Sequence, residues 1–172
     1  MSSVTKHSNV IVSDAQESDF AEIRRIYAPY VEKTTVSLED VAPDIEELKA
    51  RWNKSREKSL PYIVAKIDGN VVGYAYAFPY RLRTGYRFTV EESVYVAEGY
   101  KGTGVGHALL DALITICRAK GYKQLVAVIA GTDNNTSIKF HEKLGFRQAG
   151  VLQNVGFKFD MWVDTVLMQR DL

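Results

Sequence analysis

A glycine-rich turn between an apolar strand and an apolar helix most constrains how this chain folds. Residues 89–96, TVEESVYV, are mostly β-branched or aromatic, which is typical of a strand. The segment 98–106, EGYKGTGVG, follows, and then apolar residues recur at helical spacing. The first N–H groups of a helix lack intrahelical partners, and glycine allows close approach of a ligand to the backbone. We therefore predict a phosphate site at residues 101–107, although ordinary strand-to-helix turns also contain glycines.

Two common phosphate motifs do not match this turn. A dinucleotide fingerprint has Gly-x-Gly-x-x-Gly within a βαβ unit, and a P-loop has Lys-Ser or Lys-Thr after its glycines. Here Gly106 is followed by His107 and Ala108. The turn therefore predicts a site for the diphosphate of some other nucleotide-bearing cofactor.

Composition narrows the class of protein. A length of 172 residues favours one domain, which we place at residues 10–172 after a polar tail at 1–9 that contains His7, a residue without a predicted role. The net charge of +1 and the lack of a basic stripe argue against nucleic-acid partners and binding to anionic membranes. The single cysteine, Cys117, excludes a disulfide framework and a cysteine-based zinc site, and no metal is expected. The chain starts without an apolar signal-like stretch, so we expect a cytoplasmic protein without a membrane span.

Hydrophobic periodicity predicts a mixed α+β fold. A helix over about 19–32, with Pro29 kinking or ending it, and a second helix after Asp44 precede a hairpin of strands. Strand 125–130 is continuously apolar and is predicted to be buried on both faces. The predicted strands are 10–12, 62–67, 71–78, 88–96, 125–130, 151–159 and 162–168, and the later helices end at Gly121 and about residue 144. This order favours one largely antiparallel sheet and not a regular βαβα alternation.

Several blocks, in this order, resemble one family. The segment 101–106, KGTGVG, resembles the acyl-CoA loop of the GCN5-related N-acetyltransferase (GNAT) superfamily, with Lys101 where Gln or Arg is common. The segment 134–146, NNTSIKFHEKLGF, resembles the second signature of that superfamily. Blocks at 80–86, 89–96, 128–131, 141–146, 155–158 and 162–164 resemble its phosphinothricin and methionine sulfoximine acetyltransferase branch. The resemblance extends from about residue 11 to 169 and implies a single twisted sheet flanked by helices, with acetyl-CoA as cosubstrate.

Two adjacent glutamates, Glu91 and Glu92, lie on the strand before the glycine turn. Neighbouring strand residues point to opposite faces, so one glutamate is expected in the site and the other in solvent or at an interface. The resemblance implies that Glu91 is the general base and also lies at the substrate. An amine nucleophile must lose a proton, a carboxylate can accept it, and partial burial would raise the carboxyl pKa toward a useful value.

His141 is the histidine with the clearest predicted role. A lone histidine on a helix is usually structural or exposed, but the resemblance places His141 where the superfamily has a tyrosine beside the departing sulfur. Imidazole can hydrogen-bond an amine, accept its proton or protonate a thiolate. The resemblance therefore implies either catalysis or positioning by His141.

The cofactor contacts are also implied by the resemblance. Backbone N–H groups near the end of strand 89–96 would hold the thioester oxygen. Asn134 would touch the pantetheine arm, and it also suits a helix N-cap. His107 would help to bind a phosphate or simply lie on the helix surface. The full predicted set is Val94, Tyr95, Val96, Lys101, Gly102, Thr103, Gly104, Val105, Gly106, His107 and Asn134.

The substrate is predicted to enter past a loop rich in arginine and tyrosine. Arginine clusters usually form solvated surfaces, but this loop precedes the strand of Glu91. By resemblance, Arg81, Arg83 and Tyr86 would form the pocket, with Arg83 and Tyr86 holding an acidic group. Leu38 would form an apolar wall of the pocket, or it would simply pack in the core.

These features together predict an N-acetyltransferase that acts on the α-amino group of a small amino-acid analogue. The resemblance implies substrates of the phosphinothricin, methionine sulfoximine or methionine sulfone type, direct transfer in a ternary complex, a homodimer, and a role in herbicide or antibiotic resistance. The two alternatives are a protein or peptide N-acetyltransferase and a non-catalytic acyl-CoA-binding sensor. Glu91 and His141 argue against the sensor, and the arginine-rich loop argues against a macromolecular substrate.

Overall fold

The computed structural model describes residues 9–131 and 134–172. Most of the predicted tail, including His7, lies outside the described residues, as do Thr132 and Asp133. The helices are α1 (Phe20–Lys33), α2 (Ile45–Glu57), α3 (Val105–Ala119) and α4 (Asn135–Lys143). The strands are β1 (Ile11–Asp14), β2 (Tyr62–Ile67), β3 (Asn70–Pro79), β4 (Thr89–Val96), β5 (Gln124–Ala130), β6 (Arg147–Lys158) and β7 (Met161–Asp171). Short 3-10 turns occur at Glu17–Asp19, Thr84–Tyr86 and Glu98–Tyr100.

The described strands form one seven-stranded sheet in the order β1-β2-β3-β4-β5-β7-β6. Among these neighbours β4 and β5 are parallel, and each other pair is antiparallel. The glycine turn and α3 form the crossover that parallel neighbours require. The predicted largely antiparallel sheet with flanking helices is therefore confirmed. No helix in the described ranges is long and apolar enough to span a membrane.

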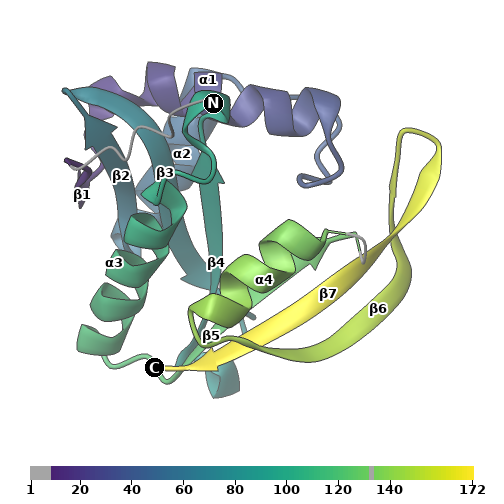
Figure 1. The fold of residues 1–172 in the computed structure, drawn as a ribbon. Coiled ribbons are helices and arrows are strands. Elements are labelled where there is room, and N and C mark those ends of the chain that lie inside the picture. Colours follow the sequence, from purple (N-terminus) through teal and green to yellow (C-terminus); the bar gives the residue numbers. More distant parts are fainter. Residues whose placement is uncertain (1–8, 132–133) are drawn as a thin grey trace.

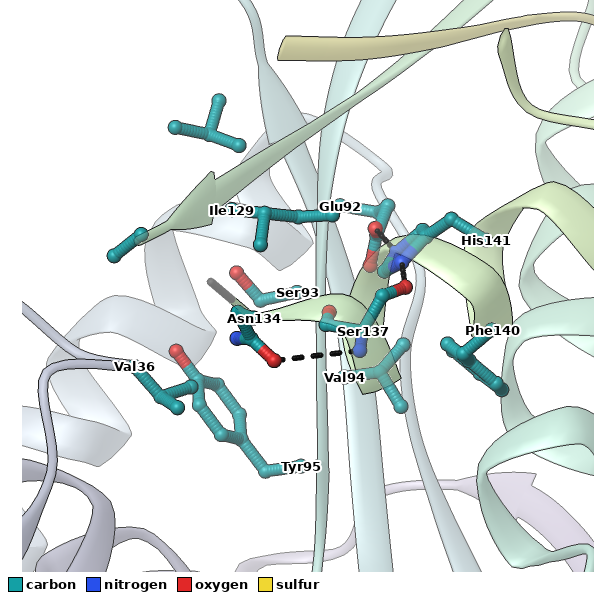
Figure 2. A pocket seen from close by; sticks show the side chains of 12 residues that line it. Val36, Glu92, Ser93, Val94, Tyr95, Ile129, Asn134, Ser137, Phe140 and His141 are labelled. Atoms are coloured by element: carbon teal, nitrogen blue, oxygen red, sulfur yellow. Dashed lines mark hydrogen bonds and ion pairs between the residues drawn. The ribbon is translucent and has the colours of Figure 1, made fainter. Parts of the chain in front are cut away.

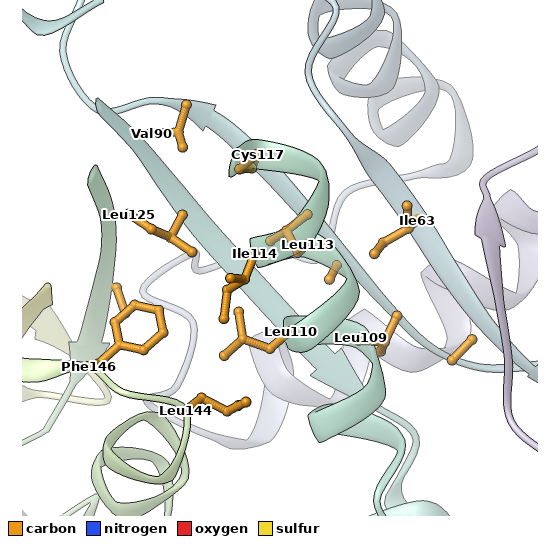
Figure 3. Packing of buried hydrophobic residues seen from close by; sticks show 14 of the residues in the cluster. Ile63, Val90, Leu109, Leu110, Leu113, Ile114, Cys117, Leu125, Leu144 and Phe146 are labelled. Carbon is orange, nitrogen blue, oxygen red and sulfur yellow. The ribbon is translucent and has the colours of Figure 1, made fainter. Parts of the chain in front are cut away.

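Helices cover both faces of the sheet (Figure 1). Because strand side chains alternate, β2 sends Tyr62 and Val64 into a core with α1 and α2, and Ile63 and Ala65 into a core with α3. The apolar face of α3, which includes Leu109, packs in the second core (Figure 3). Gly73 on β3 permits this approach, because a Cβ there would lie 2.9 Å from Leu109 Cδ1. Strand β4 is thus covered from both sides.

Helix α1 ends at Lys33, close to the predicted end at about residue 32. It does not end early at Pro29, because the proline is exposed while Tyr27 and Val31 hold both sides of it in the core. Two other local predictions need correction. Strand β6 begins at Arg147 and not at residue 151. The prediction missed this start because the first residues of the strand are mostly exposed and lack an apolar pattern. Strand β5 is not buried on both faces, because Val128 is 44% exposed where β5 leaves β4.

Candidate active site

The site is an opening between β4 and β5. The two strands pair only over Thr89–Glu92 and Gln124–Ala127. Beyond these pairs, residues 93–95 and 128–130 line opposite sides of a cavity of about 110 Å³ (Figure 2). Helix α4 closes one side, and Val36 from the α1–α2 segment lies at another. The lining residues are Val36, Glu92, Ser93, Val94, Tyr95, Val128, Ile129, Ala130, Asn134, Ser137, Phe140 and His141.

The free edge of β4 carries backbone groups that face this opening. The N–H of Ala97 donates to Val72 O on β3. Because successive strand N–H groups point to opposite edges, those of Val96 and Val94 point away from β3 and toward the opening. The backbone groups of Val96 are already hydrogen-bonded to Tyr30, because the Tyr30 hydroxyl donates to Val96 O at 2.6 Å and accepts from Val96 N at 3.4 Å. Of the predicted strand-end residues, Val94 and Tyr95 line the cavity, and Val94 presents its N–H to the open edge.

The glycine turn has the geometry of an anion site. Gly102 and Gly104 have φ of +74° and +95°, in the left-handed region that favours glycine. Gly104 is the N-cap of α3 and supplies no side-chain cap, so the first N–H groups of the helix face outward. Apart from the chain neighbours of each glycine, no heavy atom of the described residues lies within 4 Å of a Cβ built at either position. The residues present therefore fit a diphosphate, and the exposed His107 lies in the same helical turn.

The turn is also connected to the cavity. A Cβ at Gly106 would lie 3.4 Å from the ring of Phe140, which lines the cavity, and 3.5 Å from Val96. Lys101 lies near the same region, with its Nζ 2.5 Å from Glu98 Oε2 and 4.9 Å from the centre of the Tyr30 ring. The hydrogen bond to Glu98 raises the pKa of Lys101, so this side chain stays cationic.

Glu92 and His141 form a buried pair that the sequence analysis missed. The sequence analysis expected one glutamate in solvent or at an interface. Glu92 is instead buried at the cavity, with 6% of the residue exposed, and His141 is equally buried. Glu92 Oε1 lies 2.6 Å from His141 Nε2, and His141 Nδ1 lies 2.7 Å from the Ser137 carbonyl oxygen (Figure 2). Burial opposes a charge on the imidazole, but the hydrogen bond and negative charge of Glu92 prevail and raise the pKa of His141.

Glu91 points to the opposite face of β4 from Glu92, as expected. It is half-buried and is not among the lining residues of the cavity. Burial raises the pKa of Glu91 to about 7, the negative charge of Glu92 adds to this rise, and the positive charge of Arg81 opposes it. A carboxyl group that ionises near neutral pH is suited to accept a proton from an amine.

The predicted substrate loop lies on the surface beside Glu91. Arg81, Arg83 and Tyr86 are exposed, and none of these three lines the cavity. The Arg81 guanidinium lies 4.5 Å from the centre of the Tyr80 ring, and Arg81 is close enough for its charge to act on Glu91. The structure therefore brings Arg81 to the predicted base, whereas Arg83 and Tyr86 lie on the exposed surface of the loop.

The α1–α2 segment contributes Val36, and not Leu38, to the cavity. Leu38 packs against β6, because a Cβ at Gly156 would lie 2.7 Å from Leu38 Cδ1. Buried Lys158 on β6 holds both α1 and this segment, since its Nζ donates to Val31 O on α1 at 2.6 Å and to Ser37 O on the segment at 2.5 Å. Leu38 thus contacts β6, but it is 39% exposed and does not lie in the core, and its role as a wall of the substrate pocket stays a prediction.

Asn134 combines a capping role with a place at the cavity. Its side-chain oxygen accepts a hydrogen bond from Ser137 N at 3.3 Å, which caps α4. The residue also lines the cavity, and its amide lies beside the opening (Figure 2). Both alternatives raised by the sequence are therefore geometrically compatible.

Comparison with known families decides the class of this protein. Residues 12–167 match the family model described as "Acetyltransferase (GNAT) domain". The chain belongs to the GNAT superfamily. A phosphinothricin N-acetyltransferase of Alcaligenes faecalis is 48% identical over 91% of this chain and 80% of its own length. An L-methionine sulfoximine/L-methionine sulfone acetyltransferase of Pseudomonas paraeruginosa is 37% identical over 94% of both chains.

A solved GNAT structure agrees with the fold and with the cosubstrate. The phosphinothricin acetyltransferase of Sinorhizobium meliloti, solved in complex with AcCoA, is 39% identical and superposes with a TM-score of 0.91 over 95% of this chain and 88% of that one. This GNAT protein is thus an acetyl-CoA-dependent N-acetyltransferase related to phosphinothricin and methionine sulfoximine acetyltransferases. The uncapped start of α3 at its glycine turn is suited to the diphosphate of that cosubstrate.

Proposed function

We propose that this enzyme acetylates the α-amino group of a small amino-acid analogue of the phosphinothricin, methionine sulfoximine or methionine sulfone type. The observation that carries the proposal is the half-buried Glu91 carboxyl, whose pKa is raised to about 7 mainly by burial and which lies within the field of Arg81. A carboxyl group with a pKa near physiological pH can accept a proton from an amine, and a neighbouring arginine can bind the acidic group of an amino-acid substrate. Related enzymes with these named activities cover almost the whole chain.

In the proposed complex, the N–H groups at the start of α3 and the charge of Lys101 hold the diphosphate of acetyl-CoA. The pantetheine arm passes Asn134 into the opening between β4 and β5. The Val94 N–H donates to the thioester oxygen and stabilises the negative charge that develops there. Arg81, Arg83 and Tyr86 orient the acidic group of the substrate on the other face of β4, beside Glu91.

The proposed reaction is a direct transfer. Glu91 takes one proton from the substrate ammonium, the amine nitrogen attacks the thioester carbon, and the carbon–sulfur bond breaks as the amide bond forms. The nitrogen loses its second proton in this step, and that proton neutralises the CoA thiolate. The CoA thiolate leaves on the side of β4 that carries His141. Cys117 is unsuited as a covalent intermediate, because it is buried and burial raises the pKa of its thiol to about 12.

The test is thiol release from acetyl-CoA with a panel of acceptors. The panel holds phosphinothricin, methionine sulfoximine, methionine sulfone, glutamate, a polyamine and a peptide with a free N-terminus. We expect turnover with at least one of the amino-acid analogues. Turnover with the peptide alone would favour a peptide acetyltransferase, and acetyl-CoA binding without any turnover would favour a sensor.

Replacing the proposed base gives a sharper test. Because the base must be ionised, kcat/KM of the wild-type enzyme should rise with pH through about 7, the raised pKa of Glu91. Glu91→Gln should lower kcat/KM by about 10²–10⁴-fold and remove this rise. Glu57→Gln, on the exposed end of α2, is the control and should match the wild type. An unchanged rate and pH profile for Glu91→Gln would contradict the assignment.

We also infer that the enzyme works as a cytoplasmic homodimer and protects cells from such analogues. Exposed apolar side chains on the β6–β7 hairpin support the dimer, among them Phe157 at 53% and Trp162 at 68%. A single cysteine without a disulfide suits a reducing compartment.

A further inference from the structure

The Glu92–His141 pair has a proton arrangement that its partners define. A carbonyl oxygen can only accept, so the 2.7 Å contact with Ser137 O means that His141 Nδ1 carries a hydrogen. On the other side of the ring, Nε2 lies 2.6 Å from Glu92 Oε1. A neutral imidazole facing an ionised carboxylate would place two acceptors together. One proton must therefore lie between Nε2 and Oε1, and the pair as a whole has no net charge.

This arrangement leaves His141 without a free nitrogen. Both ring nitrogens are hydrogen-bonded to protein atoms, and the residue is 6% exposed. A proton from the substrate amine therefore has no vacant site on this imidazole while the pair is intact. His141 lines the cavity through its ring, which packs edge-on against Phe140 and Phe146 with centroids 5.1 Å away in each case.

The carboxylate end of the pair is next to Glu91 along β4. Other ionisable groups interact electrostatically with these two glutamates. Arg81, which follows β3, and Tyr76, on β3, interact with Glu91, and Cys117, on α3, interacts with Glu92. The negative charge of Glu92 raises the pKa of Glu91 and of Cys117, whereas Arg81 lowers that of Glu91. His141, the positive end, lies on the far side of Glu92, across the covered face of β4.

We propose that Glu92 is a positioning residue, which shares one proton with His141, holds the imidazole in a single orientation against the cavity, and acts through its charge on the Glu91 carboxylate. This inference rests on the proposed function only in its last part, because the shared proton exists whether or not Glu91 is the base. His141 then contributes a fixed ring beside the cavity, within a pair of no net charge, and is not the acceptor of the amine proton.

The first test is a ¹⁵N NMR titration of the histidine rings of the intact protein, with His141→Gln to assign the signals. In the wild type, His141 should remain an imidazolium at pH 7.5, where an unperturbed histidine is mostly neutral. In Glu92→Gln, Nδ1 should keep its hydrogen and Nε2 should show the shift of an unprotonated nitrogen. Glu142→Gln, the exposed neighbour on α4, should leave the wild-type titration unchanged. A His141 that titrates near its ordinary pKa of about 6.5 in the wild type would overturn the shared proton.

The second test is the pH dependence of kcat/KM. Glu92→Gln removes the carboxylate and, with it, the positive charge of His141. Because the carboxylate is the end of the pair nearer to Glu91, Glu91 should ionise at lower pH, and the ratio of kcat/KM at pH 6 to that at pH 8 should rise about threefold. Glu142→Gln should keep the wild-type ratio. An unchanged ratio in Glu92→Gln would overturn the action of Glu92 on Glu91. Failure of acetyl transfer in the wild type would contradict the proposed function instead. In that case, or if Glu92→Gln does not fold, the NMR titration of the wild-type protein still decides whether the proton is shared.

Discussion

Single residues in and near this site differ in the way that the sheet and helices bury them. Glu91 and Glu92 are chemically identical neighbours, yet one is half-buried beside a cation and the other is fully buried beside an imidazole. Cys117, one turn of α3 away from Ile114 and Leu113, lies in the apolar core. Environment, and not residue type, therefore separates the roles of these side chains.

The reactivity of Cys117 follows from this environment. Burial raises the pKa of its thiol from 9.0 to about 12, which lowers the thiolate fraction about 1,000-fold at neutral pH. We expect a thiol reagent to label none of the native protein within minutes and one thiol per chain after denaturation, in agreement with the single cysteine of the sequence. Mass spectrometry after timed labelling measures this. Rapid labelling of native protein would show that α3 opens easily.

At the scale of elements, the two helices beside the cavity begin in opposite ways. Helix α3 begins at Gly104 without a side-chain cap, whereas α4 is capped by Asn134. The uncapped start leaves N–H groups for an anion, and the capped start fixes a side chain beside the opening. In the proposed complex, the same backbone requirement would be met by the diphosphate at α3, whereas the protein itself meets it at α4.

The cap of α4 allows its two roles to be separated. Asn134→Ala should lower the free energy of unfolding by about 1 kcal/mol through loss of the cap, and Asn134→Asp should retain most of it. Both variants lose the amide donor, so both should raise KM for acetyl-CoA if Asn134 binds the pantetheine arm. Denaturant unfolding and acetyl-CoA kinetics measure the two effects. A normal KM in Asn134→Asp would restrict Asn134 to capping.

At the scale of the whole molecule, the β6–β7 hairpin extends away from the helical layers (Figure 1). Strand β6 is the edge of the sheet, and its residues are mostly exposed. An exposed apolar edge strand tends to pair with another chain unless it is covered. Phe157 and Trp162 lie across the hairpin from each other, with ring centroids 4.9 Å apart, and form an apolar patch suited to a second copy.

The oligomeric state tests this patch. We expect sedimentation at on the order of 10 µM to show twice the 19.4 kDa mass of one chain, and Trp162→Asp to yield monomers. Val41→Asp is the matched control, because Val41 is 80% exposed but lies on the α1–α2 segment. A dimer that survives Trp162→Asp, or a wild-type monomer, would contradict this interface.

Sequence patterns predicted those parts of the fold that depend on local spacing. The period of α3, the hairpin of β2 and β3, and the strand–glycine turn–helix order are all encoded by residues close together in the chain. The family resemblance then identified Glu91, His141 and the acyl-CoA loop as candidates. The roles of these residues stay predictions, whereas the family itself is confirmed.

Tertiary structure decided which of these residues meet. The glycine turn was evident in the sequence, and its left-handed glycines and uncapped helix agree with that prediction. The separation of β4 from β5 after Glu92 was not evident in the sequence, because it depends on pairing between strands that are separated by the whole of α3. Glu92 and His141 are 49 positions apart, and no local pattern distinguishes a solvated glutamate from one that is buried against a histidine. The sequence by itself determined the glycine turn and the family blocks that indicate the cosubstrate, and the packing of helices on both faces of β4 determined where its two glutamates lie and which groups they meet.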